Sequence, residues 1–435
     1  MSKNKLILGI GVTGISCADF FNSKDIPFRI FDTRDQDYFL NYNFRGINLD
    51  SIYFKEYPVD LLSNVDEVII SPGLDKNHRI FKDIKRHNIN VITDIDIFKR
   101  YCDSKLISVT GTNGKTTMVT MLKYAFNKIG YSCIACGNNG IPPLSIINNT
   151  YDYIMLELSS YQLEYMSDLK SFISVITNIE NDHLERHKNM ENYSKIKLSI
   201  YNDSSFSLAS NSINHLTDGT KKIKTYGITD TEEIIINGSI IKDLNYDGSK
   251  IYFKNENLEY KGKHNLENIL GVISILDIIK VNIKNSLNAL SDFNYLPHRI
   301  ELIESSNNIN WYNDSKSTNC ASTKAALECI DEKIILILGG SMKDMNYESL
   351  SSLINQKVKL VIFIGENKTY IKNQLKITTK TIDAKSIESA VEISLSHSLA
   401  NDNVLLSPAS PSFDMFKNYE ERGAAFISAV QNIVK

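Results

Sequence analysis

Residues 106–117, L-I-S-V-T-G-T-N-G-K-T-T, constrain the fold and chemistry of this chain more than any other stretch. A short apolar segment before the glycines predicts a strand, and the apolar spacing behind them predicts an amphipathic helix. Gly111 and Gly114 let backbone N–H groups approach phosphate oxygens, and Lys115 adds a positive charge. Thr116 offers a hydroxyl to Mg²⁺. The stretch therefore predicts a phosphate-binding loop, in a shortened variant of the G-x-x-x-x-G-K-[ST] pattern.

The length and composition favour a multidomain enzyme. At 435 residues the chain is long enough for about three domains, and a net charge of −3 gives no reason to expect a nucleic-acid or anionic-membrane partner. No apolar run is long enough to span a bilayer. Cys133 and Cys136 form a lone C-x-x-C, for which we expect two reduced thiols beside a buried strand rather than a zinc site. We expect a cytoplasmic monomer that acts on small molecules.

The fold class predicted is α/β, with three domains. Residues 1–93 and 299–435 each alternate apolar strands with helices, which is typical of a Rossmann-like parallel sheet. Residues 94–298 contain the phosphate loop and predict a P-loop-type ATPase domain. Within it, residues 203–262 carry short apolar and polar alternations, which predict antiparallel strands on its flank. Ligands of doubly wound sheets lie beyond the carboxyl ends of the strands, so the strand ends are the candidate site.

A second glycine-rich turn lies near the start of the chain. Gly9, Gly11 and Gly14 form G-x-G-x-x-G after a predicted strand, and Asp32 closes the next strand. By itself this pattern indicates a dinucleotide site, so a nicotinamide-dependent oxidoreductase is one hypothesis. A simple dehydrogenase has no place for the second loop at 111–117. We therefore favour a loop that holds the diphosphate of a nucleotide-linked substrate, while a tight turn needed only for packing remains the structural alternative.

Two charged residues of the central segment have opposite predictions. Glu157 ends a predicted strand near the phosphate loop, where Mg²⁺ needs a hard oxygen ligand. A generic acid at a strand end would look the same. Lys197 lies in Y-S-K-I-K-L-S-I-Y, and its spacing alone predicts a solvated helix lysine.

The run N-D-H-L-E-R-H at 181–187 offers two histidines at helical spacing. His183 and His187 could bind a metal, but the acid is one position late for the zinc-protease pattern. We expect a helix N-cap at Asn181 or Asp182, an exposed His187, and His183 alone as the functional residue.

Polar residues also follow strands of the last segment. Lys343 comes after G-G-S-M, and Ser412 and Lys417 lie in S-P-S-F-D-M-F-K-N-Y. A lysine and hydroxyls at neighbouring strand ends could receive a carboxylate. Loose strand-end loops would give the same pattern.

Taken together these motifs resemble the Mur ligases, the ATP-dependent amino-acid-adding enzymes of peptidoglycan synthesis. The resemblance runs from end to end, and its most specific blocks are N-D-S-K-S-T-N at 313–319 and L-S-P-A-S-P-S-F-D-M-F-K-N-Y-E-E-R-G at 406–423. Further matching blocks are G-x-G-x-T-G (9–14), D-T-R (32–34), S-P-G (71–73), G-T-N-G-K-T-T (111–117), E-L-S-S-Y-Q-L-E (157–164), N-D-H-L-E-R (181–186), K-L-S-I-Y (197–201), G-x-H-N-L-E-N (262–268) and L-P-H-R (296–299). Within the family, the chain is similar to the members that add D-glutamate to UDP-N-acetylmuramoyl-L-alanine.

The resemblance implies a role for each matching residue. The UDP-sugar substrate would be held by Thr13, Asp32, Thr33, Arg34, Gly73 and Asn138. ATP would be held by Gly111, Thr112, Asn113, Gly114, Lys115, Thr116, Thr117, Asn268, Arg299, Asp314 and Lys316. D-glutamate would be bound by Thr318, Lys343, Ser412 and Tyr419. The family pattern has Phe in place of Tyr419.

The resemblance also implies the catalytic set and two Mg²⁺ ions. Lys115, Glu157, His183 and Lys197 would be catalytic, with Thr116 and Glu157 on one Mg²⁺ and His183 and Lys197 on the second. The family carries Lys197 as a carbamate, which turns an ammonium into an anionic oxygen ligand. The rival hypotheses are another amide ligase such as a folylpolyglutamate synthase, the dehydrogenase, and a nucleotide-binding switch without enzyme activity.

Overall fold

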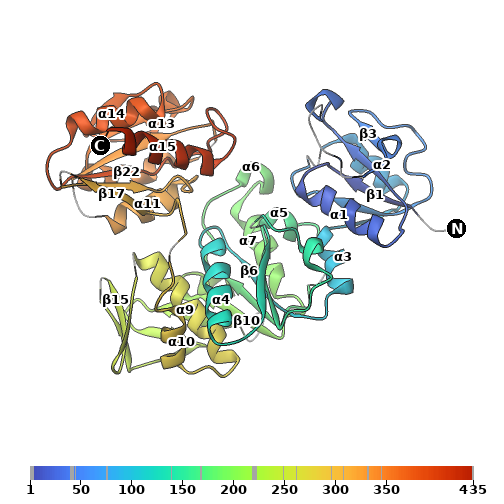
Figure 1. Ribbon diagram of the computed structural model, residues 1–435, viewed down its shortest axis with the longest axis horizontal. Helices are drawn as coiled ribbons and strands as arrows, with labels where there is room; N and C mark the ends of the chain where they lie inside the picture. The colour runs from blue at the N-terminus through green and yellow to red at the C-terminus, as the bar shows by residue number, and fades with distance from the viewer. Residues whose placement is uncertain are drawn as a thin grey trace.

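A computed structural model shows three α/β units in a chain that bends around its middle (Figure 1). The structure describes residues 4–433 except 40–43, 45, 75, 76, 139, 167, 168, 218–222, 248, 261, 295, 307, 331, 332 and 344. The N-terminal unit lies at the right of Figure 1 and the C-terminal unit at the upper left, and both flank the central unit. The predicted α/β class with three domains is therefore confirmed. Among the described helices, none is long and apolar enough to cross a membrane.

The N-terminal unit is a five-stranded parallel sheet. In spatial order its strands are β3 (Ile52–Phe54), β2 (Phe28–Asp32), β1 (Asn4–Leu8), β4 (Val65–Ile70) and β5 (Asn90–Ile92). Its helices are α1 (Val12–Ser23) and α2 (Arg79–Arg86), and α3 (Asp94–Tyr101) follows β5. β1, β2 and β4 each end in three buried residues at the carboxyl edge of the sheet, because helices cover both faces of the sheet there. The predicted Rossmann-like order, with the strand connections of a doubly wound sheet, is observed.

The central unit is built on an eight-stranded sheet. Its spatial order is β13 (Ser239–Ile240), β12 (Ile234–Ile236), β11 (Lys224–Ile228), β10 (Phe206–Ser210), β9 (Ile173–Ile176), β6 (Lys105–Thr110), β8 (Tyr153–Glu157) and β7 (Cys133–Gly137). A separate antiparallel sheet contains β14 (Leu244–Tyr246), β15 (Lys250–Phe253) and β16 (Glu256–Glu259). The helices are α4 (Lys115–Lys128), α5 (Ser160–Leu163), α6 (Leu184–His187), α7 (Met190–Leu198), α8 (Asn214–Thr217), α9 (Lys263–Ile278) and α10 (Ile283–Leu290).

One expectation for the central unit was wrong in part. Residues 203–262 were expected to be antiparallel throughout, but β10 and β11 pair in parallel and extend the main sheet. Antiparallel pairing begins only between β11 and β12. The short alternating segments gave no hint of this, because the direction of pairing depends on which neighbour the strand meets.

The C-terminal unit is a six-stranded sheet that is parallel except at one edge. Its spatial order is β17 (Glu301–Ser306), β18 (Ile309–Asn313), β22 (Asn403–Leu406), β19 (Ile334–Gly339), β20 (Val358–Ile364) and β21 (Lys380–Asp383). Its helices are α11 (Cys320–Cys329), α12 (Ser351–Lys357), α13 (Lys368–Gln374), α14 (Ile387–His397) and α15 (Tyr419–Ile433). Every residue of β19 is buried, as its continuous apolar sequence predicts for a central parallel strand.

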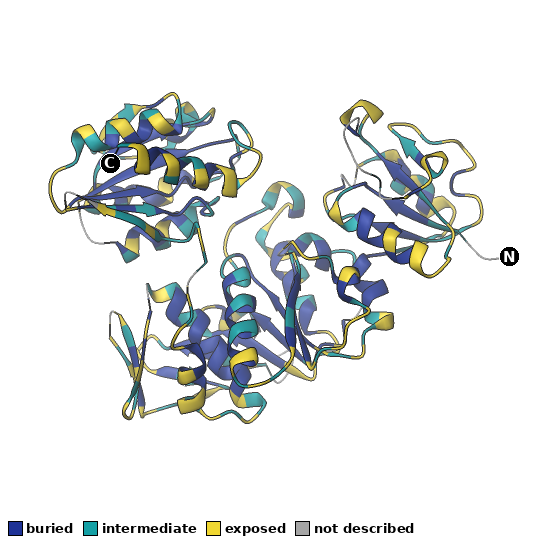
Figure 2. Cartoon of the chain, in the orientation of Figure 1, coloured by how far each residue is buried: buried dark blue, intermediate teal, exposed yellow. Residues whose placement is uncertain are grey.

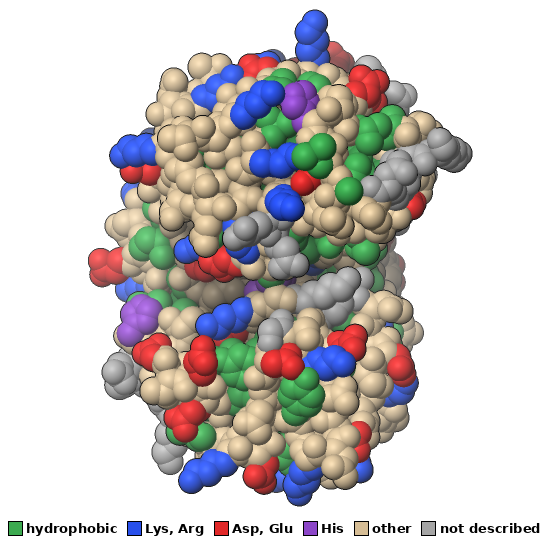
Figure 3. All heavy atoms as spheres, turned by 90° about the vertical axis from the view of Figure 1, so that its left-hand side faces the viewer, with side chains coloured by type: hydrophobic (Ala, Val, Ile, Leu, Met, Phe, Trp, Pro, Cys, Tyr) green, Lys and Arg blue, Asp and Glu red, His purple; other side chains and the backbone are tan. Residues whose placement is uncertain are grey.

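The two junctions between units differ in kind. A continuous cluster of buried apolar side chains extends from the N-terminal sheet through α3 into the central sheet. The buried side chains of the C-terminal unit form clusters of their own, visible as a separate blue core in Figure 2. Figure 3 shows the C-terminal and central units as two lobes with a furrow between them, and positive and negative side chains are interspersed on both. The N-terminal junction is therefore an apolar packing surface, whereas the C-terminal unit packs its core independently.

Candidate active site

The loop between β6 and α4 has the backbone that its glycines predict. Gly114 is the N-cap of α4 with φ of +82°, and Gly111 has φ of +153°, both in a region that side chains rarely adopt. A Cβ at Gly111 would lie 1.9 Å from Thr177 Oγ1, and one at Gly114 would lie 2.8 Å from Asn268 Oδ1. Both positions therefore need glycine, and the loop passes close to residues of β9 and α9.

The segment after β9 holds the loop in place. The backbone N–H of Thr112 donates to the carbonyl of Asn178 at 3.0 Å, and that of Asn113 donates to Asn178 Oδ1 at 2.8 Å. Asn113 Nδ2 donates to Glu180 Oε2 at 2.9 Å. These contacts preorganise the loop before any phosphate arrives.

The Lys115 ammonium lies within the loop that it follows. Its Nζ donates to the carbonyls of Gly111 at 2.9 Å and Thr112 at 2.8 Å. Burial lowers the pKa of Lys115, and the carboxylates of Glu157 and Asp182 offset part of that effect. An incoming phosphate would replace neutral carbonyl acceptors by anionic ones, which bind an ammonium more strongly.

Glu157 lies at the carboxyl end of β8 and is buried. Its Oε1 accepts from Asn138 Nδ2 at 2.9 Å, whereas Oε2 is buried without a hydrogen-bond partner among the described residues. A buried carboxylate oxygen without a donor is costly unless a cation or water binds it. The described residues hold no group of three or more His, Cys, Asp or Glu side chains arranged around a metal. The free Oε2 of Glu157 has the chemistry of a Mg²⁺ ligand, since Mg²⁺ is commonly held by one or two carboxylates together with substrate phosphates.

Lys197 is buried on α7, so the solvated lysine expected from spacing alone was wrong. Its Nζ donates to the Gly111 carbonyl at 2.7 Å and lies 4.8 Å from the ring centre of Tyr193. Burial lowers the pKa of Lys197 well below its usual value, and the nearby Lys115 charge lowers it further. Sequence periodicity missed this because the face that α7 buries is decided by the loop packed against it.

His183 and His187 lie at the two ends of the short helix α6 (Leu184–His187), and both rings pack against Tyr161. His183 is the N-cap with φ of +55°, and its Nδ1 lies 3.3 Å from Tyr161 Oη. Burial lowers the pKa of His183 despite the neighbouring Asp182 carboxylate. His187 was expected to be exposed but is buried, with Nε2 3.0 Å from Ser160 Oγ. The N-cap expected at Asn181 or Asp182 falls one residue later, since the left-handed turn is at His183 itself.

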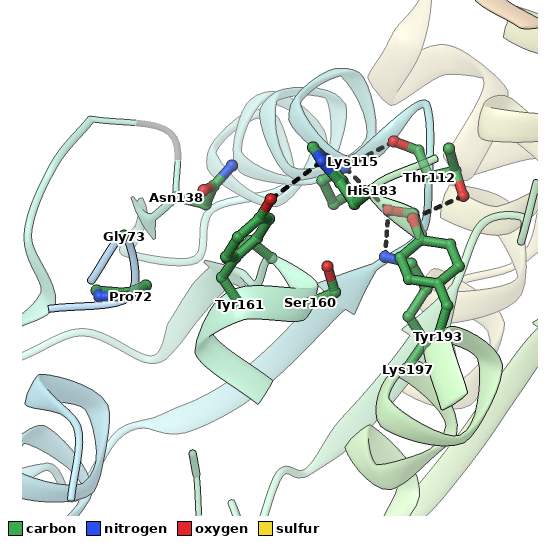
Figure 4. A pocket seen from close by; sticks show the side chains of 12 residues that line it. Pro72, Gly73, Thr112, Lys115, Asn138, Ser160, Tyr161, His183, Tyr193 and Lys197 are labelled. Atoms are coloured by element: carbon green, nitrogen blue, oxygen red, sulfur yellow. Dashed lines mark hydrogen bonds between the residues drawn. The ribbon is translucent and has the colours of Figure 1, made fainter. Parts of the chain in front are cut away.

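Lys115, His183 and Lys197 line one cavity of about 350 Å³ (Figure 4). Pro72 and Gly73 of the N-terminal unit lie on one side, and Tyr193 and Lys197 lie on the other. The remaining lining residues are Gly111, Thr112, Lys115, Asn138, Ser159, Ser160, Tyr161 and His183. The structure therefore brings the predicted phosphate loop, Asn138, His183, Lys197 and Gly73 together. Ser160, Tyr161 and Tyr193 were missed, because their only signal is proximity to Glu157 and Lys197 in the sequence.

The other residues predicted to hold the UDP-sugar substrate lie outside that lining, near the ends of β1 and β2. Asp32 accepts from the backbone N–H of Ile10 at 2.7 Å and from Arg34 Nη2 at 2.8 Å. Burial raises the pKa of Asp32, but these donors outweigh it and hold the pKa below its usual value. The Arg34 guanidinium lies over the Tyr38 ring at 4.5 Å. Thr13 is in the first turn of α1, and Thr33 lies between the paired Asp32 and Arg34.

The C-terminal unit brings a second polar group to the centre. Lys316 Nζ donates to Tyr419 Oη at 2.7 Å, and burial together with Arg299 lowers the pKa of Lys316 to about 8. Asp314 is buried, accepts from Ser407 Oγ at 2.7 Å, and burial raises its pKa to about 6. Arg299 is half-buried, and its buried Nε has no hydrogen-bond partner among the described residues. Its charge acts on Asp314 and on Glu157 across the junction.

Asp182 joins the central and C-terminal units. Its Oδ1 accepts from Lys343 Nζ at 2.7 Å and its Oδ2 accepts from Asn319 Nδ2 at 3.1 Å. The Lys343 and Asp182 side chains are 16% and 8% exposed. Thr318 precedes Asn319, and Ser412 is buried in the segment between β22 and α15. Of the residues predicted to bind an amino acid, Lys343 and Thr318 therefore lie at this junction, and none of the four lines the described cavity.

Three family models match the chain in succession. The Mur ligase MurD-like N-terminal domain matches residues 3–93, the Mur ligase middle domain matches 109–276, and the Mur ligase glutamate ligase domain matches 298–410. Among solved structures, a pseudomurein peptide ligase type C from Methanothermus fervidus has a TM-score of 0.63 at 19% identity and covers 99% of this chain and 100% of its own. A MurF ligase from Thermotoga maritima in complex with ADP has a TM-score of 0.61 at 15% identity, covering 100% and 96%. These likenesses show the fold.

Curated relatives match at higher identity. UDP-N-acetylmuramoylalanine–D-glutamate ligase of Buchnera aphidicola subsp. Schizaphis graminum is 38% identical over 99% of this chain and 98% of its own length. The enzyme of the same name from Coxiella burnetii is 34% identical over 99% and 100%. The full-length identity and the three matching domain models agree with the phosphate loop and the shared cavity: the chain belongs to the Mur ligase family.

Proposed function

We propose that the chain is an ATP-dependent ligase that joins D-glutamate to UDP-N-acetylmuramoyl-L-alanine in peptidoglycan precursor synthesis. One observation carries the proposal: a phosphate loop, His183 and Lys197 meet the S-P-G loop of the N-terminal unit around one cavity. The buried carboxylate of Glu157, which has a free oxygen, hydrogen-bonds to Asn138 of the cavity lining. The names of the full-length relatives support the same reaction. The dehydrogenase hypothesis explains only the glycine-rich loop of the N-terminal unit. A nucleotide-binding switch without enzyme activity explains neither the polar residues Arg299, Asp314 and Lys316 of the C-terminal unit nor the names of the full-length relatives.

The reaction begins at the L-alanyl carboxylate of the UDP-linked substrate. That carboxylate attacks the γ-phosphorus of ATP, the bond from the γ-phosphorus to the β–γ bridging oxygen breaks, and ADP leaves, which gives an acyl phosphate. The amine of D-glutamate then attacks the acyl carbon, and the tetrahedral intermediate loses inorganic phosphate to give the amide. Lys115, fixed by the loop carbonyls, neutralises charge that develops on the transferring phosphoryl group. The ADP complex of a structural relative supports the use of ATP.

We infer two Mg²⁺ positions, one beside this cavity and one within it. Thr116 and the unpartnered Oε2 of Glu157 fit the first, and His183 with Lys197 fits the second. Mg²⁺ would supply charge neutralisation at the transferring phosphoryl group. The low pKa of buried Lys197 supports its conversion to a carbamate, because only the neutral amine reacts with CO₂. The carbamate would then replace an ammonium by an anionic oxygen donor.

We assign the substrates to the two outer units. The UDP end would lie against Thr13, Asp32, Thr33, Arg34 and Gly73, with Asn138 beside the sugar and phosphate. D-glutamate would bind Thr318, Lys343, Ser412 and Tyr419. Asn268, Arg299, Asp314 and Lys316 would complete the ATP site from the far side of the phosphate loop. We also propose domain boundaries at residues 94 and 298 and a monomeric enzyme.

The test is ADP release with Mg²⁺, ATP and UDP-N-acetylmuramoyl-L-alanine across a panel of amino acids. The panel contains D-glutamate, L-glutamate, L-alanine, L-lysine and meso-diaminopimelate. We expect ADP release that depends on D-glutamate. Turnover with another amino acid would move the chain to a sister activity, and none with any of them would refute the ligase assignment.

A further inference from the structure

The S-P-G loop at 71–73 belongs to the N-terminal unit, yet it lines the cavity of the central unit. It follows β4, and its Pro72 and Gly73 line the cavity with Lys115 and His183. On its own side, the backbone N–H of Ser71 donates to the Leu8 carbonyl at 2.9 Å. The shared apolar core that joins the two units runs through α3 and the sheets, so it does not by itself fix this loop.

Arg186 contacts the loop from the central unit. Its Nη1 donates to the carbonyl of Leu74 at 2.8 Å, directly after Gly73. Its Nε and Nη2 both donate to Glu164 Oε2, at 3.1 and 3.0 Å, and Nη2 lies 3.3 Å from Tyr165 Oη. The guanidinium lies 5.1 Å from the ring centre of Tyr161, which lines the cavity.

This arrangement uses the planar fork of a guanidinium. The Arg186 and Glu164 side chains are only 11% and 10% exposed, so the ion pair is fixed and little screened. Because Glu164 holds Nε and Nη2, the remaining nitrogen, Nη1, is directed at the Leu74 carbonyl. A lysine ammonium is a point charge on a flexible stem and cannot reproduce both contacts in one geometry.

Arg186 lies in a short segment of the chain that contacts both outer units. Arg186 ends the segment 182–186, in which Asp182 binds the C-terminal unit and His183 faces the cavity. Figure 1 shows α6 between the two outer units. One short segment therefore contacts both outer units and carries a cavity residue between the two contacts.

We propose that Arg186 is a positioning residue that sets the S-P-G loop in register with the cavity, and so sets the affinity for the UDP-linked substrate. The inference rests on the proposed function, in which one substrate extends from the N-terminal unit to His183 and Lys115. Arg186 touches neither substrate nor the reacting atoms; it acts through the Leu74 carbonyl.

The experiment compares Arg186→Met and Arg186→Lys with the wild type in two assays. Steady-state kinetics gives KM for UDP-N-acetylmuramoyl-L-alanine, ATP and D-glutamate, and calorimetry gives the Kd of UDP alone. In Arg186→Met we expect KM for the UDP-linked substrate and the Kd of UDP to rise about tenfold, the scale of one charge-assisted hydrogen bond. We expect KM for ATP to change less than about twofold, and Arg186→Lys to be intermediate.

Arg100→Met is the matched control. Arg100 on α3 pairs with Glu67 of β4 at 2.6 Å, so it joins α3 to the N-terminal sheet through an Arg–Glu pair, but it lies outside the cavity lining and, among the described residues, makes no hydrogen bond to the S-P-G loop. We expect its KM values and UDP affinity to equal those of the wild type.

Three outcomes would overturn the inference. They are an unchanged KM and UDP affinity in Arg186→Met, an equal rise of KM for all three substrates together with a lower Tm, and the same effect in Arg100→Met. A wild-type protein without turnover would refute the proposed function instead, while the UDP affinities would still decide the role of Arg186.

Discussion

Asp182 carries two polar contacts between the central and C-terminal units, and Asp182→Asn removes its charge without changing its size. Lys343 Nζ then loses an anionic partner at 2.7 Å. The contact to Asn319 can persist, since an amide oxygen also accepts a hydrogen bond. The substitution therefore removes the Lys343 ion pair, together with the negative charge that lies 3.6 Å from His183 Nε2.

The cost follows from burial. Burial raises the pKa of Asp182, but the charges of His183 and Lys343 outweigh it and hold the pKa below its usual value. A hydrogen bond between charged groups that are mostly buried contributes about 2 kcal/mol, and its loss leaves the Lys343 ammonium partly buried and unpaired. About 2 kcal/mol shifts an equilibrium between a docked and a released C-terminal unit by about 30-fold.

The assay is small-angle scattering of the protein without ligands, together with kcat/KM for D-glutamate. We expect a larger radius of gyration for Asp182→Asn and a kcat/KM that falls by up to about 30-fold, because the docked arrangement is less populated. Asp402→Asn is the control: Asp402 is buried and pairs with Lys359 inside the C-terminal unit. Its loss lowers stability but leaves the radius of gyration of the folded protein unchanged.

Two results would refute the reasoning. An unchanged radius of gyration in Asp182→Asn would mean that other contacts dock the C-terminal unit. An equal increase in Asp402→Asn would mean that the increase reports lost stability and no specific contact.

Three further predictions concern single side chains. Lys115→Met should lower the rate of ADP release at least about a hundredfold by removing charge at the transferring phosphoryl group, while Lys128→Met, on the surface beside Asp292, should leave the rate unchanged. Tyr419→Phe removes the hydroxyl that accepts from Lys316, so the pKa of Lys316 should fall below about 8 and the basic limb of the pH profile of kcat/KM should move to lower pH; an unmoved limb would contradict this. The hydrogen bond from Arg100 outweighs the effect of burial and lowers the pKa of Glu67 from 4.5 to about 2. The Glu67 carboxylate therefore contributes folding stability above pH 4.5, and this contribution is lost as the pH falls toward 2. Glu67→Gln should remove about 1–2 kcal/mol of that acid dependence in denaturant titrations at pH 2 to 7, and an unchanged dependence would show that Glu67 does not carry it.

Local chemistry determined much of what could be predicted from the sequence. Gly111 and Gly114 indicate a backbone conformation that only glycine adopts freely, and the apolar run before them predicts a buried strand. Strand ends in a parallel sheet share one edge, so Glu157 could be placed near the phosphate loop. These signals are local because φ, strand periodicity and helix capping depend on neighbouring residues.

The tertiary structure decided the environment of each side chain. Lys197 and His187 have the sequence context of exposed helix residues, yet the phosphate loop covers the first and α5 covers the second. Asp182 and Arg186 look like ordinary helix-end charges, and their partners lie 161 and 112 residues away in the chain. The sequence by itself determined three α/β units and the location of the phosphate loop. Only the tertiary structure decided which charges are buried and which units they join, because burial and long-range pairing depend on what packs against a residue.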